Sequence, residues 1–137
     1  MKKLSLLFIS FLLGLSACEA QEEQQKPTHD NAIAFGMSMG IGWNLGNQLD
    51  AHINGVSGET FWGNQEATQQ TFNNVKKAGF RSVRIPVTWM GHVGPAPTYT
   101  IERAWLDRVE ELVLMAKQAG LITIINIHHD GFGAETD

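Results

Sequence analysis

Cysteine is almost missing from this sequence, because Cys18 is the single one among 137 residues. One thiol excludes a disulfide within the chain. A basic stripe is missing too. The sequence has 10 Lys and Arg against 14 Asp and Glu, and its formal net charge is −4. That balance argues against nucleic acid as a partner. Hydrophobic residues make up 43% of the chain, which is enough for the core of one globular domain.

The first 32 residues differ from the rest in composition. Two lysines precede the apolar run 4–15, which is too short to span a bilayer, so 1–17 is predicted to be an export signal. The sequence LSAC at 15–18 resembles a bacterial lipobox with Cys18 as the lipidated residue; the alternative is an ordinary signal peptide with an incidental cysteine. Residues 18–32 are polar and predict a flexible tether. We expect an exported lipoprotein, held at the membrane of the cell envelope or cell surface with its domain outside the cytoplasm.

Apolar runs alternate with helical periods along the rest of the chain. Strands are predicted at 40–45, 80–87 and 121–127, and helices at 68–78 and 102–119. Strands that alternate with helices run parallel, because each helix returns the chain to the start of the next strand. The chain is therefore expected to form an α/β fold.

No phosphate-binding motif accompanies this α/β pattern. The glycines of 42–47, GWNLGN, lack the spacing of a dinucleotide-binding loop, and no P-loop lysine is present. The pattern favours a (β/α) barrel over a doubly wound nucleotide-binding fold. Such a barrel takes about 250 residues. We therefore expect 33–137 to be the N-terminal part of a barrel, about its first three strands and two helices, with strand edges and apolar faces exposed.

A positive charge interrupts the second predicted strand. Arg84 lies on the opposite parity from Val83, Ile85 and Val87. Arginine is seldom buried without a partner, so Arg84 either reaches water at an edge or lies in a polar pocket with acidic partners. Pro86 cannot donate a backbone hydrogen bond, which predicts that regular pairing ends there. We interpret Arg84 as the floor of a site; a structural, salt-bridged arginine is the alternative.

Polar side chains stand at the end of each predicted strand. They are Asn44 after the first strand, Arg84 within the second, and His128 and His129 after the third. Parallel strands place all these ends on one face, which is where parallel α/β folds carry their sites.

Several motifs, in this order, resemble the cellulases of glycoside hydrolase family 5. They are GWNLGN at 42–47, ETFWGN at 59–64, AGF at 78–80, VRIPVTW at 83–89, WLDRV at 105–109 and INIHHD at 125–130. The resemblance extends from about residue 35 to 131 and is greatest to the bacterial endoglucanases that include xyloglucanases and lichenases. It implies a TIM (β/α)8 barrel that hydrolyses β-1,4-glycosidic bonds with retention during polysaccharide degradation. It implies a β-linked polysaccharide or oligosaccharide as partner, and no cofactor.

The resemblance also implies roles for individual residues. Of the family's two catalytic glutamates, one follows the fourth strand of the barrel and the other ends the seventh strand. Neither position lies in these 137 residues. The chain alone is therefore expected to be inactive. Arg84 matches the arginine that positions the nucleophilic glutamate, and His128 joins it in the catalytic centre. Asn44, Trp62 and His129 are expected to bind substrate.

Other roles remain open for several of these residues. Asn44 could form a turn, and Trp62 and Trp89 could serve packing. His128 and His129 could bind a metal, but adjacent residues on a strand point opposite ways, so no metal site is predicted. Two other functions remain open for the whole protein. It could be a non-catalytic glycan-binding lipoprotein, or a metal-dependent hydrolase with a barrel fold. The two downstream glutamates would distinguish an enzyme from a binder, and a metal assay would test the last.

The remaining aromatic residues and histidines are assigned to structure. Trp43 and Trp105 are expected in the core, His92 in a structural role, and His52 on the loop surface. The sequence departs from the family pattern in a few places, namely at Gln48, Gln65 and Glu102, where Thr, Pro and Asp are usual. The first departure is expected to alter the loop near the glycone subsites. Cellulose, xyloglucan, mixed-linkage glucan, mannan and xylan all remain possible substrates.

Overall fold

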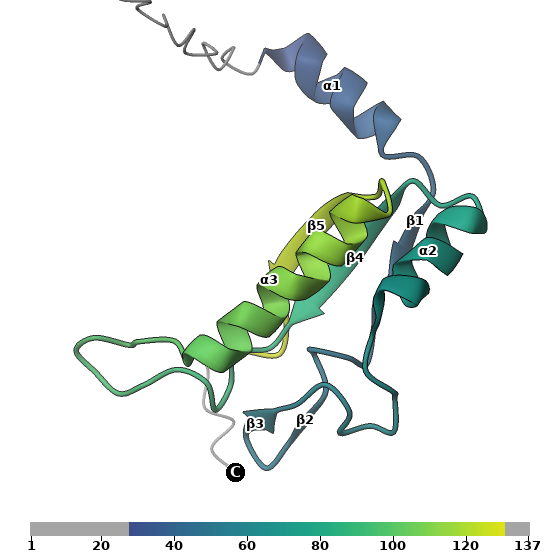
Figure 1. Cartoon of the computed structure of the whole chain (residues 1–137). Helices are drawn as coiled ribbons and strands as arrows, with labels where there is room; N and C mark the ends of the chain where they lie inside the picture. The colour runs from purple at the N-terminus through teal and green to yellow at the C-terminus, as the bar shows by residue number, and fades with distance from the viewer. Residues whose placement is uncertain (1–27, 131–137) are drawn as a thin grey trace, which may run out of the picture.

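The computed structural model describes residues 28–130, and its centre is a parallel sheet (Figure 1). The sheet has three strands in the order β1-β4-β5. Their bounds are Gly42–Asn44 for β1, Ser82–Val87 for β4 and Ile122–Ile127 for β5. The register sets Arg84 between Asn44 of β1 and Ile124 of β5. The three strands and their parallel order, predicted from the sequence, are confirmed.

Two helices connect the strands and cover one face of the sheet (Figure 1). Helix α2 spans Gln69–Lys77 and helix α3 spans Arg103–Gln118. Thr68 caps α2, and it forms a capping box with Thr71. A glycine in the left-handed region follows each helix, Gly79 with φ 99° and Gly120 with φ 75°. These bounds confirm the predicted helices at 68–78 and 102–119.

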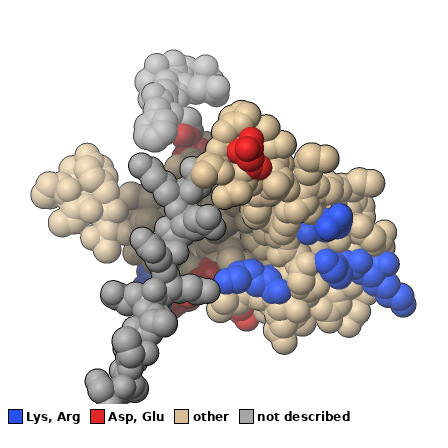
Figure 2. Space-filling view, turned by 90° about the horizontal axis from the view of Figure 1, so that it is seen from above, with Lys and Arg blue, Asp and Glu red and all other residues tan. Residues whose placement is uncertain are grey.

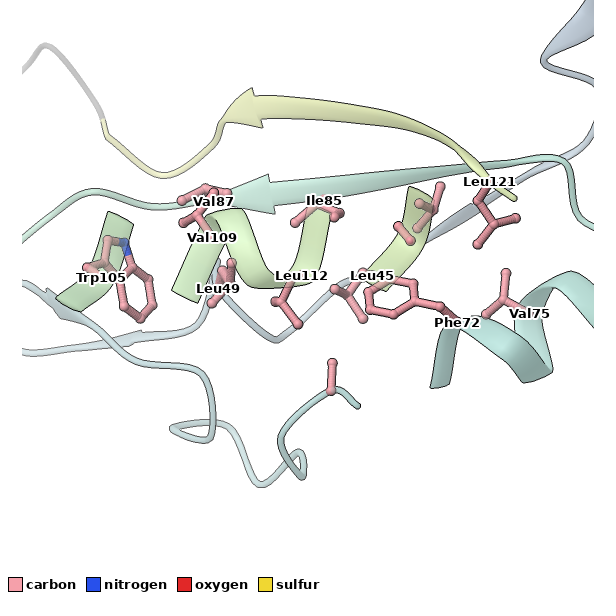
Figure 3. Close-up of a cluster of buried hydrophobic side chains, with 13 residues drawn as sticks. Leu45, Leu49, Phe72, Val75, Ile85, Val87, Trp105, Val109, Leu112 and Leu121 are labelled. Atoms are coloured by element: carbon pink, nitrogen blue, oxygen red, sulfur yellow. The ribbon is translucent and has the colours of Figure 1, made fainter. Parts of the chain in front are cut away.

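The core lies between the sheet and the helices (Figure 3). Val83, Ile85 and Val87 of β4 are fully buried, and Figure 3 shows Ile85 and Val87 on the side of the sheet that faces α3. The buried members of the apolar stripe of α3 are Trp105, Val109, Leu112 and Ala116. Each large apolar side chain buried here stabilises the fold by about 1.5–3 kcal/mol. This layer holds β4, and with it Arg84, in a fixed position.

Pro86 does not end strand β4, contrary to the prediction. Pairing with β5 continues past it to Val87, which lies opposite Ile127. Backbone groups of successive residues point to opposite neighbours, and the carbonyl of Arg84 faces β1, where it accepts from the N–H of Leu45. Pro86, two residues on, faces the same side, but β1 has already ended. Its missing N–H therefore removes no bond from the ladder with β5.

The first loop contains a short antiparallel hairpin that was not predicted. Strand β2 spans His52–Ile53 and strand β3 spans Val56–Ser57. Asn54 and Gly55 join them with φ 53° and 77°, the left-handed pair that a tight hairpin turn needs. Figure 1 shows the hairpin beyond the carboxyl ends of β4 and β5.

An N-terminal helix, α1, spans His29–Ser38 and begins inside the segment predicted as a tether. Thr28 caps it by accepting a hydrogen bond from the backbone N–H of Asn31. None of its residues is buried, and Figure 1 shows it standing apart from the sheet. The predicted export signal and Cys18 lie outside the described residues. Between residues 28 and 130, no helix combines the length and apolar character needed to cross a bilayer.

Apolar side chains are exposed along β5, as expected for part of a barrel. Ile125 is 48% exposed and Ile127 is 62% exposed. Figure 2 shows a face with a few separate basic and acidic groups rather than a continuous basic stripe. Strand β5 is an edge strand of the described sheet, so its free backbone edge is where a further strand would pair.

Candidate functional site

Three of the predicted site residues meet at the carboxyl ends of the strands. Nη1 of Arg84 donates to Oδ1 of Asn44 at 2.6 Å. Nη2 of Arg84 lies 3.3 Å from Nδ1 of His128. The contacts arise because Asn44 is opposite Arg84 in register and His128 directly follows β5. Each side chain comes from a different strand, so the sheet itself sets their spacing.

Arg84 lies in a polar setting rather than in an ion pair. Its side chain is partly buried, and within residues 28–130 no carboxylate oxygen lies within 4.0 Å of it. A guanidinium has five N–H donors, and the contacts to Asn44 and His128 engage two of them. The group therefore retains donors for an incoming acceptor such as a carboxylate.

A buried carboxylate stands behind His128, and the sequence reasoning missed it. Asp50 is 5% exposed, and its Oδ1 accepts from the backbone N–H of Gln48 at 2.9 Å. Its Oδ2 lies 4.0 Å from Nε2 of His128. One feature of the sequence could have indicated it: Asp50 is an acidic residue between the apolar Leu49 and Ala51, both of which are fully buried in the structure.

Four aromatic rings form a cluster beside this polar group; we call it the aromatic cluster. It consists of His52, Trp62, His128 and His129. The ring centroids of Trp62 and His52 are 5.3 Å apart, those of His52 and His129 4.9 Å, and those of Trp62 and His129 5.9 Å. Trp62 is 43% exposed, and its Nε1 donates to the carbonyl of His52. His52 is thus not a free loop residue but lies between Trp62 and the histidine pair.

The two adjacent histidines do not point opposite ways, so that prediction is wrong. The ring centroids of His128 and His129 are 4.3 Å apart. Strand β5 ends at Ile127 and the chain bends at His129, so the alternation of a strand does not extend to them. Both histidines and Asp50 offer ligand atoms within 4.8 Å of one another. The guanidinium of Arg84, 3.3 Å from His128, disfavours a cation in that place.

The turn after β5 is fastened to the end of β4. Both carboxylate oxygens of Asp130 accept from the backbone N–H of Trp89 at 2.8 Å. The backbone N–H of His129 donates to Oγ1 of Thr88 at 3.2 Å. These contacts fix the backbone that carries the histidine pair. Trp89 is partly buried and packs against the core, which is the packing role left open above.

The hairpin is held in place by a second set of contacts. Oγ of Ser57 donates to the carbonyl of Thr88 at 2.6 Å. His92 lies between Glu102 and the Ser57 carbonyl, at 2.6 Å and 2.9 Å, and stacks on Trp105 with centroids 4.2 Å apart. These contacts fit the structural role predicted for His92. They tie the loop after β4, the start of α3 and the hairpin together.

Two positions that depart from the family pattern contact one another. Nε2 of Gln48 donates to the carbonyl of Gln65 at 3.0 Å. Asn64, beside Gln65, donates through Nδ2 to the carbonyl of Asn47 at 2.6 Å. The two ends of the long first loop are therefore joined close to Asp50.

Trp43 packs against the core, as predicted.

His129 is expected to titrate at a lower pH than an ordinary histidine. Burial is the largest cause that lowers its pKa below 6.5, and the nearby rings of His128 and His52 lower it further; Asp50 and Asp130 oppose them. Because the folded pKa is depressed, this neutral ring stabilises the fold above about pH 6.5, and that contribution is lost as the pH falls. An NMR titration of His129 should give a midpoint below 6.5.

The same effect is expected in unfolding experiments. His129→Gln should lose less stability than the parent protein when the pH is lowered from neutral, because glutamine does not titrate. Urea unfolding across that range measures the difference. A His129 midpoint at or above the ordinary value, with equal acid sensitivity of the two proteins, would contradict the assignment.

Comparison with known protein families gives a clear match. The family model "Cellulase (glycosyl hydrolase family 5)" matches residues 46–136. Endoglucanase A of Paenibacillus barcinonensis is 40% identical over 135 residues, which is 96% of this chain and 34% of that protein. Cellulase/esterase CelE of Acetivibrio thermocellus is 49% identical over 100 residues, which is 73% of this chain and 12% of that protein. The chain thus spans about a third or less of these relatives.

Solved structures give the same result. A Bacteroidetes-affiliated GH5 cellulase linked with a polysaccharide utilization locus is 76% identical, with a TM-score of 0.73 over 77% of this chain and 27% of that chain. A GH5-4 broad specificity endoglucanase from Bacteroides salanitronis is 65% identical, with a TM-score of 0.67 over 69% and 25%. A family 5 xyloglucanase from Paenibacillus pabuli is 52% identical, with a TM-score of 0.68 over 71% and 27%.

Proposed function

Because this chain belongs to the cellulase family, glycosyl hydrolase family 5, we propose that it is the N-terminal part of a retaining endo-β-1,4-glucanase. Its strands β1, β4 and β5 with their helices are part of the TIM (β/α)8 barrel of that family. The observation that carries the proposal is the set of Arg84, Asn44 and His128 at the carboxyl ends of three strands. Active sites of such barrels lie at that face.

Retaining hydrolysis needs two carboxyl groups about 5–5.5 Å apart, one as nucleophile and one as acid and base. By the family pattern both are glutamates on later strands, which these 137 residues do not include. We therefore assign supporting work to this chain. Arg84 has donors to hold the nucleophile as an ion in a bidentate pair. Residues 1–137 alone are expected to be inactive.

The aromatic cluster and Asn44 suit a sugar chain. The exposed face of Trp62 offers flat apolar area to the C–H face of a pyranose ring. A neutral His129 offers one donor and one acceptor to sugar hydroxyls, and its lowered pKa favours that form near neutral pH. The amide of Asn44 can contact a further hydroxyl. These groups support a neutral β-linked glucan as substrate.

The relatives narrow the choice of substrate. One solved relative is a xyloglucanase, another is described as a broad specificity endoglucanase, and a Bacillus licheniformis endo-beta-1,4-glucanase is complexed with cellotetraose. We propose β-1,4-glucans, with or without side chains, ahead of mannan and xylan.

Hydrolysis assays on the full-length protein that carries this chain test the function. Carboxymethyl cellulose, xyloglucan, mannan and xylan are the substrates, and NMR of the first product gives its anomer. We expect new reducing ends from the glucans and a product with retained configuration. Glycan binding without new reducing ends would instead support a non-catalytic glycan-binding protein. Product of inverted configuration would exclude the retaining mechanism.

We further propose that the protein is exported and held at the cell envelope or surface by a lipid on Cys18. The proposal rests on the sequence LSAC after the apolar run, with 1–17 as signal and 18–32 as tether. Cys18→Ser should move the protein from the membrane fraction to the soluble fraction, because the acyl chains supply the anchoring free energy. Ser16→Ala, inside the signal, is the matched control and should remain with the membrane. Unchanged membrane association of Cys18→Ser would exclude the anchor.

A further inference from the structure

Asp50 is a buried carboxylate whose charge no neighbouring lysine or arginine balances. It is 5% exposed, and within residues 28–130 the only group of a basic residue within 4.0 Å of its carboxylate oxygens is the ring of His128. Burying a carboxylate without a partner is costly, so such groups are rare unless they have a task. Its Oδ1 is held by the backbone N–H of Gln48 at 2.9 Å, which leaves Oδ2 for His128.

The backbone that carries Asp50 is rigid. Thr88 donates its N–H to the carbonyl of Leu49 at 3.0 Å, and Gly58 donates to the carbonyl of Ala51 at 2.9 Å. Leu49 and Ala51 are both fully buried. A side chain between two such anchors has a fixed position, which is the requirement for a group that orients another.

The contact between His128 and Arg84 shows which ring nitrogen carries the proton. A guanidinium has donors and no acceptor, so Nδ1 of His128, 3.3 Å from Nη2 of Arg84, must accept. In a neutral ring the proton then lies on Nε2. Nε2 is the atom that faces Oδ2 of Asp50 at 4.0 Å, a distance that a small rotation or one bridging water closes.

These contacts form a continuous line from the protein interior to the site. It runs from Asp50 to His128, then to Arg84, then to Asn44, whose Oδ1 accepts from Arg84 at 2.6 Å. We propose that Asp50 is a positioning residue of this hydrolase. It holds His128 with the proton on Nε2, so that Nδ1 accepts from Arg84 and fixes the guanidinium for the nucleophile. This inference rests on the proposed function only in its effect on turnover, because the protonation of His128 is measured separately.

The substitution Asp50→Asn tests the inference because it keeps the shape of the side chain and replaces one of its two acceptor oxygens with a donor. The amide oxygen can still accept from Gln48, but the amide nitrogen then donates toward Nε2 of His128. The ring must move its proton to Nδ1, where it faces the donors of Arg84. In the full-length protein we expect kcat to fall by about 10²-fold, as when a group behind an essential side chain is lost. KM should change by about twofold or less, since no substrate contact is removed.

NMR of the ring nitrogens of His128 gives a readout that a purely structural role would not move. The parent protein should show the proton on Nε2, and Asp50→Asn should show it on Nδ1. The control is Glu59→Gln, which also removes a buried carboxylate from the first loop. The Glu59 side chain is 9% exposed, but it pairs with Arg108 and not with His128. Folded Glu59→Gln should retain the parent protonation of His128 and the parent kcat, even where its Tm falls.

Each outcome decides the inference. A proton on Nδ1 of His128 in the parent protein overturns it, and this needs no variant to fold. Parent-like protonation and kcat in Asp50→Asn overturn it as well. If the parent protein hydrolyses no glucan, the proposed function fails, whereas the shift of the proton between parent and Asp50→Asn still supports the positioning role of Asp50.

Discussion

Arg84→Ala in the full-length protein should lower kcat by about 10²- to 10³-fold and change KM little. The guanidinium is expected to hold the nucleophilic carboxylate ionised and oriented, and alanine leaves that carboxylate without its partner. The substrate contacts proposed for Trp62 and His129 do not involve Arg84, which is why KM should hold. Steady-state kinetics on a soluble β-glucan measure both constants.

Two further variants make this result specific. Arg84→Lys should not restore kcat, because an ammonium cannot contact Asn44, His128 and a carboxylate in one plane. Arg81→Ala, at an exposed position just before the start of β4, should behave like the parent protein. A kcat of Arg84→Ala within a few-fold of the parent value would refute the assigned role and leave Arg84 as a structural arginine.

Arg108→Ala should lower the free energy of unfolding by about 3 kcal/mol, the low end for breaking a buried ion pair, because Arg108 is one-fifth exposed. Nε and Nη2 of Arg108 donate to both carboxylate oxygens of Glu59, and Nη2 also donates to the carbonyl of Ala67. The hydrogen bonds with Glu59 raise the pKa of Arg108 above its usual range, so the guanidinium remains charged. Alanine leaves the Glu59 carboxylate buried and loosens the first loop from α3. Urea unfolding of the full-length protein measures the loss.

Arg103→Ala is the matched control on the same helix. Arg103 pairs with Asp107 at 2.6 Å, but its side chain is 76% exposed. Exposed pairs contribute little to stability, so the Tm should hardly change. If Arg103→Ala and Arg108→Ala lose the same free energy of unfolding, burial of the Arg108–Glu59 pair does not add to its contribution to stability.

The elements that carry the core could be predicted because their signals are local. The apolar stripe of α3 and the glycines Gly79 and Gly120 set the helix bounds to within a residue or two. The alternation of strands and helices implied parallel strands, and the parallel order placed Asn44, Arg84 and His128 at one edge. Neither step needed knowledge of distant contacts.

The parts that were missed depend on contacts between distant segments. Asp50 becomes part of the site only because β5 delivers His128 beside it, 78 positions further along the sequence. The histidine pair was assigned strand geometry, whereas Asp130 bonds to Trp89 and bends the chain at His129. The prediction that pairing ends at Pro86 fails because the sequence does not show that its missing N–H faces β1, which already ends at Asn44.

The hairpin of β2 and β3 has a consequence for protein engineering. Its base cannot vary, because Ser57 bonds to the carbonyl of Thr88 and a side chain at Gly91 would come within 2.9 Å of Val56. Its tip, Asn54 and Gly55, is exposed, and there the closest approach to a side chain at Gly55 is the sulfur of Met90 at 4.0 Å. A single substitution of Gly55 would be strained at φ 77°, so the tip suits a grafted segment that replaces the whole two-residue turn. From there an inserted segment would change the surface next to the aromatic cluster while the residues at the base of the hairpin keep their spacing.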